Sequence, residues 1–203
     1  GCNNARTQHN RDHIAICKEL IKNDVLVLTT GCTAIACAME GLLTPEAAAV
    51  HAGPGLAEVC ETVGISPVLH LGSCVDNSRI LLAATEVVKA GGLGNDISEW
   101  PVAGSAPEWM SEKAISIGHY FVASGVYTVF GYMLPTSGAP VFHDYISKEF
   151  EKMYGGMWDV EPDPIKHAHK MIAHIDKKRK ALGIDKARER VLMDMQSRQA
   201  LEV

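Results

Sequence analysis

The sequence predicts an α/β protein with a doubly wound, Rossmann-like parallel sheet and a helical C-terminal tail. Two observations carry this prediction. Short apolar runs rich in β-branched residues are typical of strands buried on both faces of a parallel sheet. Each run is followed by a glycine-marked turn and a helical segment, and the three runs occupy residues 25–28, 67–71 and 126–130. Sites in such folds form at the carboxyl ends of the strands.

Helical segments are expected between the strands, because apolar residues recur there at three- and four-residue spacing. Loops marked by Gly and Pro are expected at 95–106 and 131–140, and the chain beyond is expected to be helical to its end. The expected helices cover residues 11–22, 33–40, 45–63 with a break at 53–55, 76–89 and 107–124.

Charge and composition narrow the class of protein. The formal net charge of −5 gives no electrostatic reason to bind nucleic acid or an anionic membrane. No apolar run is long enough to cross a bilayer and no secretion signal is present, so we expect no membrane contact and a cytoplasmic location. Because a motif-like sequence begins at Gly1, we expect the chain to be a piece of a longer polypeptide.

Three cysteines lie in Gly-containing turns ahead of predicted helices. Cys32 and Cys74 each follow a predicted strand, and Cys2 lies in a similar turn before the first helix. The fold would bring such turns to one edge of the sheet, where the amino ends of helices favour thiolates. Convergent thiolates are the ligands that Fe-S clusters, zinc or nickel prefer. The alternative is that these cysteines are small residues in tight turns.

The other cysteines and the histidines give weaker signals. Inside predicted helices, among apolar residues, lie three cysteines that we interpret as core: Cys17, Cys37 and Cys60. His9 and His13 are four residues apart, a spacing that can chelate, yet a polar helix surface explains them equally well. Structural roles are favoured for His70 and His119. Solvated positions are expected for three histidines of the tail, namely His167, His169 and His174.

Lys113 lies in a mostly apolar helical stretch that follows a long loop. The lysine side chain can reach solvent or pair with Glu112, which would make it a surface residue. Alternatively it faces a site, where a fixed ammonium would stabilise negative charge on a substrate oxygen. The residues alone leave both readings open.

The cysteine turns are also where the sequence resembles a known family. The motifs GCNN at residues 1–4, TGCTA at 30–34 and above all LHLGSCVDNSR at 69–79 are similar to the cluster-binding motifs of the nickel-containing anaerobic carbon monoxide dehydrogenases. This resemblance covers residues 1 to about 156. The tail from 162 to 183 is more similar to the archaeal alpha subunit of the acetyl-CoA decarbonylase/synthase complex.

The resemblance implies a Ni-Fe-S cluster that holds nickel, iron and sulfide. It implies Cys2 and Cys32 as ligands of the iron-sulfur cubane, Cys74 as the nickel ligand and Lys113 as the catalytic lysine. Ile117, one helical turn further on, matches an apolar residue that crowds the CO2 site. We accordingly divide the chain into a Rossmann-like cluster-binding domain, 1–156, and a helical C-terminal extension, 157–203.

The implied reaction is the reversible conversion of CO and water to CO2, two protons and two electrons. The implied partners are CO or CO2 as substrate, a ferredoxin-like electron carrier, and a second copy or other subunits in a dimer or larger complex. The family's remaining ligands and its further 4Fe-4S clusters would belong to sequence upstream of Gly1, so the isolated chain is expected not to oxidise CO.

Two alternatives from other classes stay open. One is a fragment of a hybrid-cluster protein, which reduces hydroxylamine at an iron-sulfur-oxygen cluster on a similar architecture, and nickel content would distinguish the two. The other is a noncatalytic metal-binding or assembly module, in which exchanging Lys113 would change nothing functional.

Overall fold

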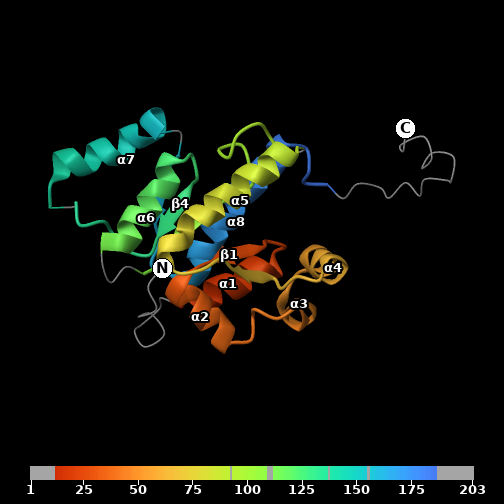
Figure 1. Ribbon diagram of the computed structural model, residues 1–203. Helices are drawn as coiled ribbons and strands as arrows, with labels where there is room; N and C mark the ends of the chain where they lie inside the picture. The colour runs from red at the N-terminus through yellow and green to blue at the C-terminus, as the bar shows by residue number, and fades with distance from the viewer. Residues whose placement is uncertain (1–11, 92, 109–111, 137, 155, 187–203) are drawn as a thin grey trace.

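The structure, a computed structural model, describes residues 12–91, 93–108, 112–136, 138–154 and 156–186 (Figure 1). In this view α1 to α4 lie at one end of the molecule and α6, β4 and α7 at the other, with α5 and α8 running between them. No helix of the described residues is both long and apolar enough to cross a membrane.

The first part of the chain gives two parallel strands and the helices that follow them. The elements are α1 (His13–Lys22), β1 (Val27–Thr29), α2 (Gly31–Met39), α3 (Glu46–His51), α4 (Pro54–Val63), β2 (Val68–His70), the short 3-10 helix η2 (Cys74–Asp76) and α5 (Asn77–Ala90). Asp12 caps α1 by accepting hydrogen bonds from Ile14 N and Ala15 N. The expected break near Gly53 separates α3 from α4, and Pro54 opens α4.

The second part of the chain gives three more strands. Its elements are β3 (Gly104–Ala106), α6 (Glu112–Ala123), β4 (Thr128–Phe130), α7 (Pro140–Tyr154), β5 (Trp158–Val160) and α8 (Pro164–Ala181). The helix expected to begin at Pro107 is wrong at its start, because Pro107 directly follows β3 and is not helical. The uninterrupted helical run expected after residue 140 is also wrong, because β5 interrupts it.

All strand pairs in the described residues are parallel, and the α/β class is confirmed. The three predicted strands do not share one hydrogen-bonded ladder, however. β1 pairs with β2, with Val27 opposite Val68, whereas β4 pairs with β3 on one side and β5 on the other. β3 and β5 were missed because neither contains an apolar run; their strand conformation depends on hydrogen bonds to the buried β4.

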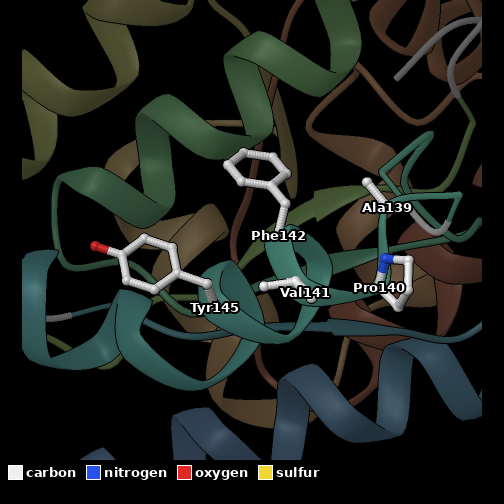
Figure 2. A pocket seen from close by; sticks show the side chains of 5 residues that line it. All are labelled: Ala139, Pro140, Val141, Phe142 and Tyr145. Carbon is white, nitrogen blue, oxygen red and sulfur yellow. The ribbon is translucent and has the colours of Figure 1, made fainter.

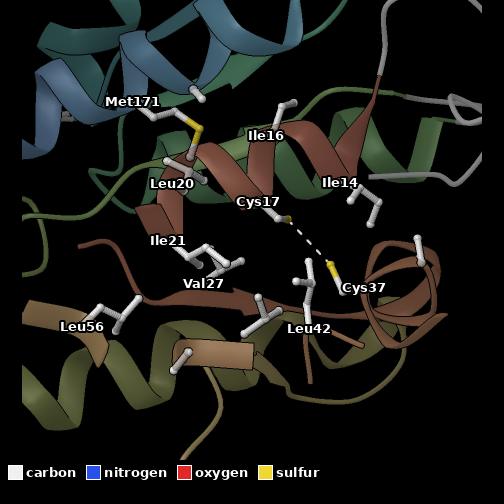
Figure 3. Packing of buried hydrophobic residues seen from close by; sticks show 14 of the residues in the cluster. Ile14, Ile16, Cys17, Leu20, Ile21, Val27, Cys37, Leu42, Leu56 and Met171 are labelled. Carbon is white, nitrogen blue, oxygen red and sulfur yellow. Dashed lines mark hydrogen bonds between the residues drawn. The ribbon is translucent and has the colours of Figure 1, made fainter. Parts of the chain in front are cut away.

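The main core lies around α1, which packs against α8 from the far end of the sequence. Ile16, Leu20 and Ile21 of α1 meet Met171 of α8 and Val27 of β1 (Figure 3). The described part of the C-terminal segment is therefore joined to the preceding chain in two places, by α8 in the core around α1 and by β5 in the sheet with β4. The division of the chain at residue 156 stays a prediction.

Asp24, in the turn between α1 and β1, links three elements. Its backbone has a left-handed φ of 59°. Its carboxylate accepts a hydrogen bond from Leu56 N at the start of α4, at 2.8 Å. Its carbonyl oxygen accepts from Arg179 Nη2 of α8, also at 2.8 Å. A Cβ at Gly53 would collide with the Asp24 carboxylate, so glycine is needed there.

A smaller apolar cluster lies under α6 and α7 and consists of Ala106, Phe130, Leu134 and Ile146. The start of α7 also leaves apolar side chains at the surface around a hollow of about 500 Å³ (Figure 2). None of the predicted site residues lines this hollow; its residues are Ala139, Pro140, Val141, Phe142 and Tyr145.

Candidate functional site

A cavity of about 250 Å³ lies between the two sheets. Residues of β1 and β3 both line it, and α1, α5, α6 and α8 close it from the sides. Placed edge to edge, the two sheets would have the strand order β2-β1-β3-β4-β5. The chain order along the sheet then changes direction between β1 and β3. In open parallel α/β folds, ligands bind at this reversal, beyond the carboxyl ends of the strands.

The turn that carries Cys74 is held by local hydrogen bonds. The Asp76 carboxylate accepts from Ser73 N at 2.7 Å and from Ser73 Oγ at 2.9 Å, which forms a capping box. The hydrogen bond from the Ser73 backbone lowers the pKa of Asp76, so this carboxylate remains charged. His70 Nδ1 accepts from Gly72 N, in keeping with the structural role favoured for it. Cys74 is exposed at the end of this turn and also lines the cavity.

The turn that carries Cys32 lies directly against the Cys74 turn. Gly31 N donates to Gly72 O at 2.9 Å. Gly31 has a φ of +58°, and a Cβ added there would collide with Cys74 Sγ. The helix begins at Gly31 rather than at the expected Thr33, so Cys32 lies in the first turn of α2. Its thiol is exposed and is not in a disulfide.

Lys113 and Ile117 of α6 line the same cavity as Cys74. They are four residues apart and therefore share one face of the helix. Lys113 forms no ion pair with Glu112 or with any other residue in the described ranges. The pairing with Glu112 considered for Lys113 is thus not seen. The Lys113 side chain is exposed, as the solvent alternative expects, and it also lines the cavity.

Cys2 lies outside the described residues, so the structure does not bear on its place. Within the described ranges, no three His, Cys, Asp or Glu side chains form a group that could hold a metal ion. The structure therefore brings together Cys74, Lys113 and Ile117 around one cavity, with the Cys32 turn beside Cys74. The roles that the resemblance implies for these residues stay predictions.

The core placement of Cys17, Cys37 and Cys60 is confirmed, since all three are buried. Cys17 additionally lines the cavity, which the helical pattern could not reveal because α1 is apolar around much of its surface.

Two expectations for the histidines are not met. The polar helix surface, one of the two explanations left open for His13, is excluded because His13 is 1% exposed and lines the cavity. His167, expected to be solvated, is also 1% exposed. Its Nε2 lies 2.8 Å from Ser105 Oγ, and its Nδ1 lies 3.1 Å from Glu161 O. The carbonyl can only accept, so Nδ1 donates to it and Nε2 accepts from the serine hydroxyl.

The burial of His167 lowers its pKa to about 4, so the ring is neutral at neutral pH. His174 is half-buried and stacks on Tyr127, and burial likewise lowers its pKa to about 4. His169 alone of the three tail histidines is exposed, and its Nε2 lies 3.1 Å from Glu19 Oε1. The sequence reasoning missed the Ser105–His167 pair because β3 itself was not predicted.

Comparison with known proteins defines the class. The Prismane/CO dehydrogenase family matches residues 1–165. The chain belongs to this family, and the predicted family is confirmed.

Particular relatives narrow the resemblance further. The chain is 57% identical over 185 residues to carbon monoxide dehydrogenase 1 of Methanosarcina mazei, covering 91% of this chain and 29% of that protein. It is 37% identical over 196 residues to the carbon monoxide dehydrogenase/acetyl-CoA synthase subunit beta of Moorella thermoacetica, covering 92% of this chain and 28% of that subunit.

A solved structure gives the same fold. The as-isolated, Ni-free carbon monoxide dehydrogenase of Thermococcus sp. AM4, produced without the CooC maturase, superposes with a TM-score of 0.82 at 54% identity. The match covers 90% of this chain and 28% of that one. The chain thus spans less than a third of the length of these relatives.

Proposed function

We propose that this chain is part of an anaerobic carbon monoxide dehydrogenase and contributes one wall of its active site. The observation that carries the proposal is the shared cavity of Cys74, Lys113 and Ile117, with the Cys32 turn hydrogen-bonded to the Cys74 turn. A metal-binding assembly module would need the cysteines but would assign no role to Lys113, which lines the same cavity.

The residues present fit part of the ligand set of a Ni-Fe-S cluster. Cys32 and Cys74 are free, exposed thiols in adjacent turns, and Gly31 leaves room for the Cys74 sulfur. Soft thiolates are suited to nickel and to iron-sulfur centres. We propose Cys32 and Cys2 as iron-sulfur ligands and Cys74 as the nickel ligand, with the remaining ligands and further 4Fe-4S clusters outside this chain. When bound, such a cluster supplies the two-electron chemistry that interconverts CO and CO2.

The chain's own residues would act on the substrate around that centre. The Lys113 ammonium has no competing ion pair in the described ranges and would stabilise negative charge on the substrate oxygens. Ile117, one turn further along α6, would limit the space beside them. The walls of the cavity from β1, α1 and α6 are largely apolar.

The proposed partners follow from the class of reaction. The two electrons need an acceptor, for which we propose a ferredoxin-like carrier. The Moorella thermoacetica relative is a subunit of a protein named for both carbon monoxide dehydrogenase and acetyl-CoA synthase, which supports assembly of this chain's parent protein in a dimer or larger complex. A hydroxylamine-reducing hybrid-cluster protein is the weaker proposal, since the relatives compared here are carbon monoxide dehydrogenases.

The test exchanges Lys113 for alanine in the complete protein that carries this chain, purified without oxygen. CO-dependent dye reduction should fall by about 10²–10³-fold, the usual loss when one charge-stabilising donor is removed. Nickel, iron and sulfide contents should stay unchanged.

The matched control is Lys89→Ala, because Lys89 is exposed and pairs only with Glu86 on the surface of α5. Its activity should equal that of the unaltered protein. Near-normal activity of Lys113→Ala would contradict the proposed role, and an absence of nickel from the active protein would favour the hybrid-cluster alternative.

A further inference from the structure

Two buried cysteines face each other in the main core. Cys17 Sγ of α1 and Cys37 Sγ of α2 lie 3.7 Å apart and share a hydrogen bond, drawn as the dashed line in Figure 3. Their exposed fractions are 4% and 0%. Cys60 of α4 belongs to the same core but has no sulfur partner in the described ranges. Of the three buried cysteines in this core, Cys17 and Cys37 are therefore the two whose sulfurs are in contact.

The pair is buried but can be reached by a small molecule, because Cys17 lines the cavity between the sheets. The cavity holds about 250 Å³, compared with roughly 30 Å³ for a water molecule in the liquid. A molecule the size of hydrogen peroxide that enters the cavity would thus meet the Cys17 sulfur first and find the Cys37 sulfur behind it. A lone buried thiol would have no second sulfur with which to form a disulfide.

We propose that Cys17 and Cys37 form a peroxide-sensitive thiol pair that closes to a disulfide between α1 and α2. The inference does not depend on the proposed function, because neither residue is one of the proposed metal ligands. It concerns the core that supports the site rather than the site itself.

The reaction balances with peroxide as the only oxidant. The Cys17 sulfur bonds to one peroxide oxygen as the O–O bond breaks, which gives a sulfenic acid and one water. The Cys37 sulfur then attacks the Cys17 sulfur, the S–O bond breaks, and the hydroxyl leaves with the Cys37 proton as a second water. Two thiols lose two electrons, and the peroxide is reduced to two waters.

The environment of each sulfur affects the two steps in opposite ways. The hydrogen bond with Cys37 and burial raise the pKa of Cys17, so the first step should be slow. The hydrogen-bonded contact with Cys17 lowers the pKa of Cys37, which favours the thiolate that the second step needs. Once the sulfenic acid has formed, its nearest reaction partner is already in contact.

Closure would change the helix that carries a proposed ligand. The sulfurs must approach from 3.7 Å to about 2.05 Å, the length of a disulfide bond. α1 and α2 would be tied together, and α2 presents Cys32 in its first turn. Oxidation of the core pair would thus be transmitted to the edge of the sheet at which Cys32 and Cys74 lie.

The experiment treats the complete protein, purified without oxygen, with increasing hydrogen peroxide, then blocks free thiols under denaturing conditions and maps the peptides by mass spectrometry. The expected result is loss of the two alkylated cysteines and appearance of a Cys17–Cys37 linked species, lighter than the two free thiols by two hydrogens. Dithiothreitol should reverse it. Met39, on α2 and 70% exposed, provides an internal record of the peroxide dose through its sulfoxide.

Matched variants keep the outcome interpretable. Cys60→Ser should leave the linkage unchanged, whereas Cys17→Ser and Cys37→Ser should each abolish it. The inference is overturned if both thiols remain alkylatable in the unaltered protein after Met39 is fully oxidised. It is equally overturned if Cys17 or Cys37 links to Cys60, because that pairing requires an opened core. Since these two outcomes are measured on the unaltered protein, a variant that fails to fold does not weaken the test.

Discussion

The two sheets of this molecule carry different parts of the candidate site. The β1–β2 sheet ends in two exposed glycine turns that present Cys32 and Cys74. The β3–β4–β5 sheet is built around the fully buried β4, and its helix α6 brings Lys113 and Ile117 to the same cavity. One sheet therefore presents two exposed thiols, the proposed ligands, on short turns, while the other presents a charge and an apolar side chain on a helix that packs against a buried strand. Ligation and charge placement can then be altered separately.

The sharpest way to break this contrast is to remove the base of the second sheet. Phe130 of β4 is 0% exposed and packs against His119 and Trp158. Phe130→Ala should lower the free energy of unfolding by about 3–5 kcal/mol, since it leaves a cavity in the core. Chemical denaturation of the purified protein measures this.

The matched change in the first sheet is Cys74→Ser. Because Cys74 is exposed, the free energy of unfolding should fall by no more than about 0.5 kcal/mol when both proteins are compared without metal. The metal content of the variant purified without oxygen should fall. Comparable losses of stability for Phe130→Ala and Cys74→Ser would contradict this difference between the two sheets.

Buried His167 of α8, which contacts Ser105 of the second sheet, gives a pH dependence of stability in mildly acidic solution. The pKa of His167 falls to about 4 in the folded protein because of burial, against about 6.5 in the unfolded chain. The unfolded state therefore binds more protons below pH 6.5, and stability contributed by the neutral ring is present above that pH and lost as the pH falls toward 4. The loss is on the order of 3 kcal/mol.

Denaturation across pH 4 to 7 tests this dependence against two variants. His167→Gln should remove this part of the pH dependence, whereas His169→Gln, at an exposed position, should retain it. An unchanged pH profile in His167→Gln would mean that folding does not lower the pKa of this ring.

A smaller effect is expected where the two cysteine turns touch. Gly31→Ala should cost about 1–2 kcal/mol for the left-handed backbone alone, and its methyl group would also push against Cys74 Sγ. Gly64→Ala is the matched control, because Gly64 has a φ of +76° and open space around its Cβ position. Both stability and the rate of Cys74 alkylation should differ more for Gly31→Ala. Equal behaviour of the two variants would show that the turns are not in contact in solution.

The parts of the fold that could be predicted were those with a local signal. β1, β2 and β4 each contain an apolar run, and the Gly-Cys turns after the first two located Cys32 and Cys74. β3, with the sequence Gly-Ser-Ala, and β5, with Trp-Asp-Val, are strands only because β4 lies beside them. Gly-Ser-Ala has no strand-favouring residue, and Trp-Asp-Val, which has two, is too short to be distinguished from a loop by its pattern.

The site divides in the same way. Lys113 could be singled out as a charge in an apolar helix, but its place at the cavity depends on how α6 packs against β3. His167 lies in a charged, amphipathic stretch that suggests solvent, and its burial follows from the approach of Ser105 on a strand that the pattern did not reveal. Cys17 and Cys37 are twenty positions apart in separate helices, so their contact depends on helix packing.

The two hydrogen bonds that Asp24 accepts connect parts of the chain that are far apart in the sequence. Arg179 of α8 donates a hydrogen bond to the Asp24 carbonyl just before β1, although the two residues are 155 positions apart in the sequence. The exit of that strand leads directly into Gly31 and Cys32. Truncation of the chain before Arg179 would remove the hydrogen bond at the start of β1 and destabilise that strand. A change in α8 could thus displace the Cys32 sulfur, which follows the other end of β1.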